Sequence, residues 1–116
     1  MGVAVVTGTF VFRLRKDIDL DAYQQAQFRM YEIVSGDPAY GFISIDSYES
    51  ASGETVLMAE FESYDGMQAW RQHPEHLVTQ ERGRTEWFES YWGAQLIRLY
   101  EWDPEGGRRV LAEPVL

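Results

Sequence analysis

The most constraining feature of the sequence is its first strand-like segment, residues 3–14, which is apolar on both of its faces. The segment is rich in Val, Thr and Phe and ends in a charged stretch, a composition typical of a strand that reaches the surface. Alternate residues of a strand point to opposite faces, and here neither set is polar. We therefore expect both faces of this strand to be covered.

The residues that follow change period. Residues 17–36 place apolar side chains at helical spacing, with Asp19 as the expected N-cap and Gly36 as the C-terminal stop. Residues 40–49 and 55–62 have the composition of strands and are separated by a short Ser/Gly turn. This part of the chain predicts a helix followed by an antiparallel hairpin.

A second helix and a fourth strand complete the pattern. Ser63 is the expected N-cap of the helix, and Pro74 should bend or stop it because proline lacks an amide hydrogen. The helix is expected to restart and run to about residue 91, and residues 92–102 predict the last strand. The chain is therefore ordered strand, helix, strand, strand, helix, strand.

This order predicts an α+β fold, the ferredoxin-like βαββαβ arrangement with an antiparallel sheet, which two helices cover on one face. The apolar side chains on the other face need a second partner, and another copy of the chain is the simplest one. We expect a symmetric homodimer in which sheet packs against sheet. Residues 1–103 would form the domain, and the apolar tail at residues 104–116 is expected to pack on the partner subunit.

Composition excludes several classes of function. The 116 residues suffice for one domain, and the net charge of -9 disfavours nucleic acid and anionic lipid as partners. There is no cysteine, so disulfides and thiolate chemistry are excluded, and two histidines leave few metal ligands. No apolar run approaches the roughly 20 residues of a membrane span, and no signal peptide is evident. We expect a soluble cytoplasmic protein without a membrane partner.

Residues 61–76, with the sequence FESYDGMQAWRQHPEH, carry a resemblance together with the preceding GFISIDSYES and TVLMAEF. They resemble the antibiotic biosynthesis monooxygenase domain, a dimeric α+β barrel family, and the match extends over residues 3–102. The most specific part is an Ala-Trp pair followed by a His-Pro-x-His bend. The resemblance implies a small cofactor-independent monooxygenase that acts on an aromatic, quinone-like or polyketide-derived molecule.

Some functions of the resembled family do not transfer to this chain. The haem-degrading relatives use an Asn on the first strand, a Trp at the end of the third and a His on the second helix. The chain has Thr7 and Gly8, Phe61 and Gln80 at these positions, and it contains no asparagine. The Asn and Trp on strand three of the anthrone-type oxygenases are replaced by Leu57 and Phe61. Haem degradation is therefore disfavoured, and catalysis would depend more heavily on the second helix.

Three polar residues of the second helix are candidates for catalysis. His73 could accept a proton, since an imidazole pKa near 6.5 suits transfer at neutral pH. Arg84 could stabilise a phenolate or enolate oxygen by a charge-assisted hydrogen bond. His76 could act in catalysis, or it could hydrogen-bond a backbone carbonyl that Pro74 leaves free.

The expected substrate-binding residues are mostly aromatic and lie on the same stretch or on neighbouring elements. They are Trp70, Gln80, Tyr31, Phe61, Trp87 and Tyr91. Aromatic residues at helical spacing could equally form part of the core. A polyketide cyclase or isomerase of the same barrel type, and a non-catalytic module that binds small ligands, are the alternatives to the monooxygenase. No cofactor and no metal are expected in any of them.

Overall fold

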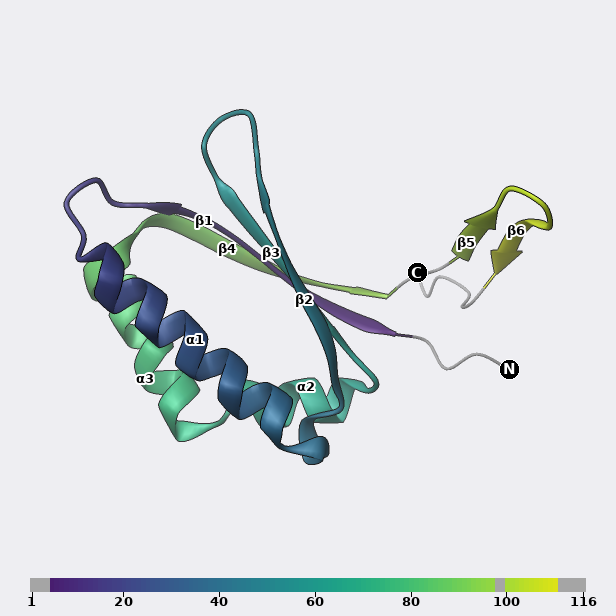
Figure 1. The fold of residues 1–116 in the computed structure, drawn as a ribbon, viewed down its shortest axis with the longest axis horizontal. Helices are drawn as coiled ribbons and strands as arrows, with labels where there is room; N and C mark the ends of the chain where they lie inside the picture. The colour runs from purple at the N-terminus through teal and green to yellow at the C-terminus, as the bar shows by residue number, and fades with distance from the viewer. Residues whose placement is uncertain (1–4, 98–99, 111–116) are drawn as a thin grey trace.

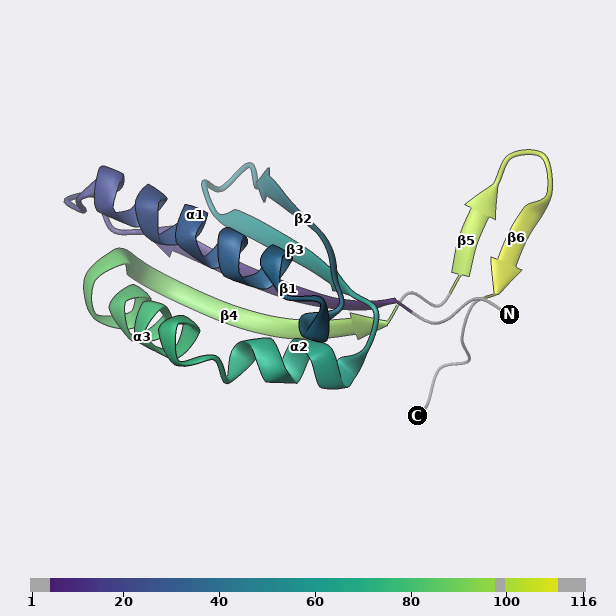
Figure 2. The ribbon, with the colours of Figure 1, turned by 60° about the horizontal axis from the view of Figure 1, so that its bottom comes forward.

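The computed structural model describes residues 5–97 and 100–110, and its main body is an antiparallel sheet covered on one face by helices. Figures 1 and 2 show the helices gathered on one side of the strands. The sheet has the order β2-β3-β1-β4, with β1 (Val6–Leu14), β2 (Phe42–Glu49), β3 (Thr55–Phe61) and β4 (Phe88–Ile97). The predicted ferredoxin-like α+β class is confirmed.

Helix α1 (Leu20–Gly36) has the predicted ends. The Asp19 carboxylate accepts a hydrogen bond from the Ala22 amide at 3.0 Å, which satisfies one of the unpaired donors of the first turn. Met30 and Val34, one turn apart, are the buried residues of the helix and face the sheet side of the molecule. Local capping signals and helical period were sufficient to define this element.

The hairpin of β2 and β3 also forms as predicted, with one difference at its start. Residues 38–40 form a short 3-10 turn, η1 (Pro38–Tyr40), so β2 begins at Phe42 and not at residue 40. The Asp37 side chain caps that turn by accepting from the Ala39 amide at 2.9 Å. The tip of the hairpin contains Gly53 with φ of 86°, a backbone conformation that favours glycine.

The second helix is broken at the proline, as expected. Helix α2 (Tyr64–Arg71) begins after Ser63, whose hydroxyl accepts from the Gly66 amide at 3.0 Å. Helix α3 (Pro74–Arg82) restarts with Pro74 in its first turn, where a missing amide hydrogen costs nothing. None of the helices within residues 5–97 and 100–110 is long and apolar enough to cross a membrane.

The predicted boundary between the last helix and the fourth strand is wrong. After α3 the chain makes one π-helical turn, η2 (Gly83–Trp87), and enters β4 directly at Phe88, four residues earlier than expected. Residues 88–91 therefore belong to the sheet, where Phe88 pairs with Leu14 and Tyr91 with Phe12. The aromatic residues of this stretch recur at helical spacing, but pairing with the central strand β1 overrides that local pattern.

The C-terminal residues form a separate hairpin of β5 (Tyr100–Asp103) and β6 (Gly107–Val110). Figure 1 shows it beyond the ends of β1 and β4, away from the helices. The expected fourth strand thus ends at Ile97, and part of the expected tail is a strand of its own. Residues 111–116, the remainder of that tail, lie outside the described residues.

The core has two parts, one at each end of the helical layer. At the α2 end, a buried cluster contains Val6, Met30, Val34, Phe61, Met67 and Trp70. At the other end, aromatic rings from β1, α1 and β4 pack together, with Phe12 and Trp87 buried. A cavity lies between these two packed ends, and it defines the candidate site.

Candidate functional site

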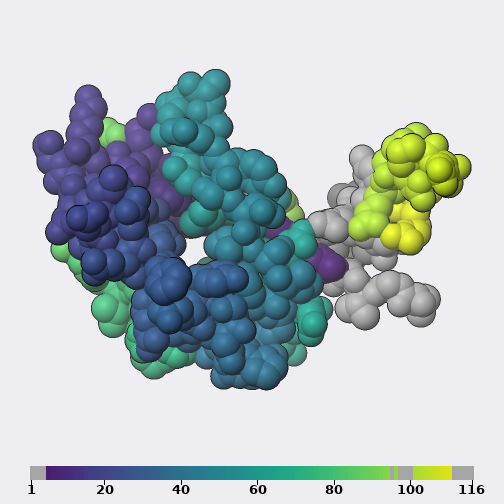
Figure 3. All heavy atoms as spheres, in the orientation of Figure 1, coloured from purple at the N-terminus to yellow at the C-terminus, as the bar shows by residue number. Residues whose placement is uncertain are grey.

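A cavity of about 1150 Å³ lies between the helices and the sheet. Its walls come from α1, α2, α3 and the turn η2, and its floor comes from the four strands of the main sheet. Figure 3 shows the surface hollowed between α1 and the β2–β3 hairpin. A cavity of this size can hold a ligand of several fused rings.

Small residues of the sheet create the space over its floor. Gly8 of β1, Ala59 of β3 and Gly93 of β4 all line the cavity. A Cβ atom added at Gly93 would meet only ordinary contacts, the nearest being Thr9 O at 3.5 Å and Phe10 Cδ1 at 3.8 Å. Larger side chains at these positions would occupy the space between sheet and helices. Glycine within a strand is consistent with the close approach of a ligand.

The walls are mainly apolar and aromatic, with polar groups on the helical side. The lining includes Phe10, Phe28, Met30, Tyr31, Val34, Phe42, Leu57, Phe61, Met67, Trp70, Leu77, Phe88 and Tyr91. Gln27, His76, Thr79, Gln80, Glu81 and Arg84 add polar groups. Ligand pockets typically combine a largely apolar lining with a few polar groups that fix orientation.

His76 has the most defined geometry of the polar lining. Its ring stacks on the Trp70 indole, with centroids 4.3 Å apart and planes inclined by 15°. Its Nδ1 is 3.1 Å from the carbonyl oxygen of Trp70, and since a carbonyl only accepts, Nδ1 carries the proton. Burial lowers the pKa of His76 below its ordinary value and outweighs the hydrogen bond to the Trp70 carbonyl, which raises it; the charges of Arg71 and His73 lower it further. The ring is therefore neutral near pH 7, with Nε2 left as an acceptor.

His73 does not line the cavity. It is the N-cap of α3, and its Nδ1 accepts a hydrogen bond from the Glu75 amide at 3.1 Å. The His73 ring lies near that of Trp70, with centroids 5.6 Å apart, but the chain is extended at His73, with φ of -60° and ψ of 131°. The expected bond between His76 and a carbonyl freed by Pro74 is present.

Arg84 lies at the rim of the cavity, in the turn η2. Its guanidinium binds the Glu81 carboxylate through Nε, at 3.1 Å, and through Nη2. Both side chains are more than half exposed, so solvent screens the pair. The pKa of Arg84 is raised by the hydrogen bonds that it donates to Glu81, and the residue remains a cation whose charge is largely balanced by its partner.

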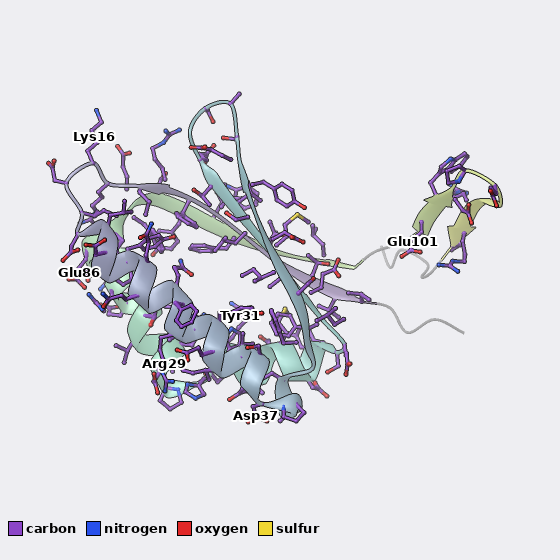
Figure 4. The ribbon with its side chains drawn as sticks, in the orientation of Figure 1. Lys16, Arg29, Tyr31, Asp37, Glu86 and Glu101 are labelled. Atoms are coloured by element: carbon purple, nitrogen blue, oxygen red, sulfur yellow. The ribbon has the colours of Figure 1, made fainter. Side chains whose placement is uncertain are left out.

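Five of the six expected binding residues line the cavity, namely Trp70, Gln80, Tyr31, Phe61 and Tyr91. Figure 4 shows Tyr31 on the side of α1 that faces the strands, where its ring meets Phe42 with centroids 5.9 Å apart. Trp87 is buried elsewhere, with its ring against Tyr23 and under the Arg82 guanidinium. Trp87 is thus a core residue and not part of the lining.

Several residues that shape the site were not predicted from the sequence. Gln27 lines the cavity and donates through Nε2 to the Tyr23 hydroxyl at 2.8 Å. Burial raises the pKa of Tyr23, so this hydroxyl stays protonated. The floor glycines Gly8 and Gly93 were also missed, although glycine inside a strand-like segment is a signal of close approach.

No group of three or more His, Cys, Asp or Glu side chains that could hold a metal ion occurs among residues 5–97 and 100–110. At the start of α3, His73 caps the helix. Glu75 is paired with Arg29, whose Nε lies 3.0 Å from the carboxylate. Figure 4 shows Arg29 on the side of α1 away from the strands.

The opposite face of the sheet carries a continuous apolar row. Strand register aligns Tyr48, Val56, Val11 and Trp92 across all four strands. Val11 is buried at the centre of this row, while Tyr48 and Trp92 at its two ends are 55% and 57% exposed. Leu96, four residues further along β4, is 47% exposed. This helix-free face therefore exposes large apolar side chains.

The fold and cavity define a small ferredoxin-like α+β protein with a largely apolar cavity between its helices and its sheet. No family model matches the sequence. The uncharacterised protein YqjZ of Bacillus subtilis is 31% identical over 81 residues, which are 70% of this chain and 69% of YqjZ. The chain belongs to the family of YqjZ.

Solved structures share the fold. A protein of Nitrosomonas europaea, provisionally assigned as an antibiotic biosynthesis monooxygenase, superposes with a TM-score of 0.65 and 20% identity over 86% of this chain and 94% of its own. SnoaB of Streptomyces nogalater, a cofactor-independent oxygenase, has a TM-score of 0.63 and 14% identity, and the match covers 80% of this chain and 91% of its own. A dimeric ferredoxin-like protein of unknown function from Thermobifida fusca has a TM-score of 0.60 and 13% identity, and the match covers 80% of this chain and 90% of its own. The resemblance to the antibiotic biosynthesis monooxygenase domain is thus confirmed at the level of the fold.

Proposed function

We propose that the protein is a homodimeric, cofactor-independent monooxygenase that oxidises a small, flat, hydroxylated aromatic or quinone-like molecule, of polyketide-derived type, in the cavity. The observation that carries the proposal is the neutral His76, stacked on Trp70 in the wall of an apolar cavity and holding its proton on Nδ1. SnoaB, which shares the fold, is a cofactor-independent oxygenase, and this supports the reaction class.

His76 has the properties of a general base. With Nδ1 protonated, the Nε2 lone pair is free to accept the proton of a phenol or enol. The electron-rich anion then reduces O₂ directly. For an anthrone, the methylene becomes a carbonyl, one oxygen atom enters the product and the other leaves as water, so the substrate supplies the electrons. Apolar walls keep bulk water from the anion.

The charges around the cavity favour a ligand that arrives uncharged. The Arg84 guanidinium is engaged by the Glu81 carboxylate, and His76 is kept neutral by burial. The chain as a whole carries a net charge of -9. A carboxylate or phosphate would find little compensation here, whereas a phenol can donate to His76. In this proposal Arg84 stabilises the developing oxyanion only if Glu81 yields part of its pairing.

The exposed apolar face of the sheet supports the homodimer. Tyr48, Trp92 and Leu96 would be buried by a second copy that packs sheet against sheet, and the similar protein from Thermobifida fusca is dimeric. The isolated hairpin of β5 and β6, with Trp102 71% exposed, would gain a surface on the partner subunit. Residues 1–103 would then act as the domain and residues 104–116 as an arm.

Oxygen consumption with 1,8-dihydroxy-9-anthrone tests the reaction. We expect the wild type to consume O₂ with this substrate. In the His76→Gln variant the rate of O₂ consumption should fall by about 100-fold or more, the usual contribution of a general base. The matched control is His73→Asn, which retains an N-cap side chain outside the cavity and should remain active.

Other outcomes would redirect the assignment. Turnover of a polyketide-type substrate without oxygen would indicate a cyclase or isomerase of the same barrel type. Tight binding of the anthrone with no turnover would indicate a ligand-binding module. Equal activity of the His76→Gln variant and the wild type would remove His76 from the mechanism.

A further inference from the structure

The end of the cavity opposite Trp70 is formed by the turn that joins α3 to β4, and this turn is an unusual one. Its five residues, Gly83–Trp87, are π-helical, and the Phe88 amide donates to the Gly83 carbonyl to close it. The chain then enters β4 with no intervening loop. Single π-helical turns are rare and occur frequently at functional sites.

The turn directs two residues into the cavity. Arg84 and Phe88 are both part of the lining, and the Phe88 ring packs on Phe10 and Phe12 with centroids 5.4 and 4.7 Å apart. The Phe88 ring lies across Gly83, where a Cβ atom would overlap Phe88 Cε2. Since Gly83 has φ of -57° and ψ of -47°, glycine is needed here for space and not for backbone conformation.

Arg15, from the loop after β1, binds the carbonyl groups at the end of this turn. Its Nε donates to Phe88 O at 3.0 Å, its Nη1 to Thr85 O at 2.8 Å and its Nη2 to Arg84 O at 3.0 Å. The Arg15 amide donates to Trp87 O at 2.8 Å. Four donors of one residue therefore bind four consecutive or nearly consecutive carbonyl groups, at positions 84, 85, 87 and 88.

This arrangement matches what the end of a helix requires. The last carbonyl groups of a helical segment have no intrahelical partner, and a cation near them also interacts favourably with the helix dipole. A planar guanidinium presents several donors in a fixed fork, which a lysine ammonium cannot reproduce. Arg15 makes no contact with the cavity itself, so its influence on a ligand must act through Arg84 and Phe88.

We propose that Arg15 is a positioning residue that holds the Gly83–Trp87 turn in its π-helical form and thereby sets the place of Phe88 and Arg84 in the end wall of the cavity. The proposal rests on the cavity being the ligand site, as in the proposed function. Loss of the fork would let the turn relax, shift the Phe88 ring and weaken binding of a flat aromatic ligand.

The experiment compares Arg15→Gln and Arg15→Lys with the control Lys16→Gln in two measurements. Figure 4 shows Lys16 at the tip of the same loop, pointing away from the molecule. The first measurement is the dissociation constant for 1-naphthol well below the unfolding temperature. We expect affinity to fall about tenfold in Arg15→Gln, by an intermediate factor in Arg15→Lys and not in Lys16→Gln.

The second measurement is the amide chemical shift and hydrogen exchange of Phe88, whose amide closes the π turn. This measurement requires no ligand, so it tests the role of Arg15 even if the wild type does not bind naphthol. Absence of naphthol binding by the wild type would count against the proposed function alone. We expect faster exchange at Phe88 in Arg15→Gln, with partial rescue in Arg15→Lys. An unchanged Phe88 amide in a folded Arg15→Gln variant would overturn the proposal, as would unchanged naphthol affinity.

Discussion

The His76 imidazole lies flat on the Trp70 indole, 4.3 Å from it, and binds the carbonyl oxygen of the same tryptophan through Nδ1. One residue thus fixes both the plane of the ring and its tautomer. Stacking restricts rotation of the imidazole, and the carbonyl restricts where its proton can lie. Since both contacts come from Trp70, a ligand meets a histidine with one defined acceptor.

The stability of the protein should depend on pH through His76. Its pKa is lowered mainly by burial, so the unfolded chain binds this proton more readily than the folded one. The free energy of unfolding therefore rises with pH between the pKa of His76 in the folded state and its pKa in the unfolded state. The full contribution is present above the unfolded pKa near 6.5 and is lost as the pH falls toward the lower pKa of the folded state. Urea unfolding at pH 5, 6, 7 and 8 should show a smaller loss in His76→Gln than in the wild type.

The comparison variant is His73→Asn, which preserves the cap of α3 and removes only the smallest of the effects that lower the pKa of His76, so the pH dependence should change much less than in His76→Gln. Glu75 and Glu81, whose pKa values are lowered by their arginine partners, act at more acidic pH and leave this window unaffected. Identical slopes for the wild type and His76→Gln between pH 5 and 7 would contradict the prediction.

Gly93→Val should block the cavity with little loss of stability. A Cβ atom at Gly93 would meet only ordinary van der Waals contacts, and valine is well suited to a strand. We expect naphthol binding to be lost while the urea midpoint changes little. Isothermal titration and urea unfolding provide the two measurements. Retained affinity in the folded variant would show that ligands do not use the floor of the cavity.

Gly83→Ala should destabilise the protein, by about 1–3 kcal/mol, the usual cost of overpacking. The new Cβ would overlap the Phe88 ring, which is held among Phe10, Phe12 and Tyr91. The matched control is Gly36→Ala at the end of α1, where nothing lies within 4 Å and alanine favours the helix. Denaturant unfolding should separate the two, and equal stability of both variants would argue against the tight contact between Gly83 and Phe88.

Trp92→Glu should disrupt the proposed homodimer. A carboxylate at the end of the apolar row would be buried without a partner when sheet packs on sheet. Sedimentation at micromolar concentration should give a dimer for the wild type and a monomer for the variant. Val78→Glu, on the exposed surface of α3, is the control and should remain dimeric. A wild-type mass equal to one chain would refute the homodimer.

Elements defined by local chemistry were predictable from the sequence. Asp19 and Ser63 act as N-caps through contacts to amides three residues away, and Pro74 stops a helix by lacking its own amide. The strand order follows from alternating segments, so the fold class needed no long-range information. Three lining residues of α2 and α3, Trp70, His76 and Gln80, were also predicted from the sequence.

The sequence-based predictions that were wrong involve residues that are in contact but distant in the sequence. The end of the last helix is set by Arg15, which binds carbonyl groups 69 to 73 residues away. The choice between the two histidines depended on the extended backbone at residue 73, which resets the helical phase after Trp70. Trp87 is buried by contacts with Tyr23 and Arg82. Neither contact could be recognised from the sequence, so Trp87 could not be identified there as a core residue.

Pro74 does not line the cavity, yet the state of His76 depends on it. In a continuous helix the Trp70 carbonyl would accept from the amide of residue 74. Proline has no such amide, so that oxygen remains available to the His73 amide, at 3.0 Å, and to the His76 ring. Replacing Pro74 by alanine would introduce a competing donor and free the imidazole to exchange tautomers. In the proposed mechanism, the tautomer of the base therefore depends on an amide hydrogen that the backbone lacks at residue 74.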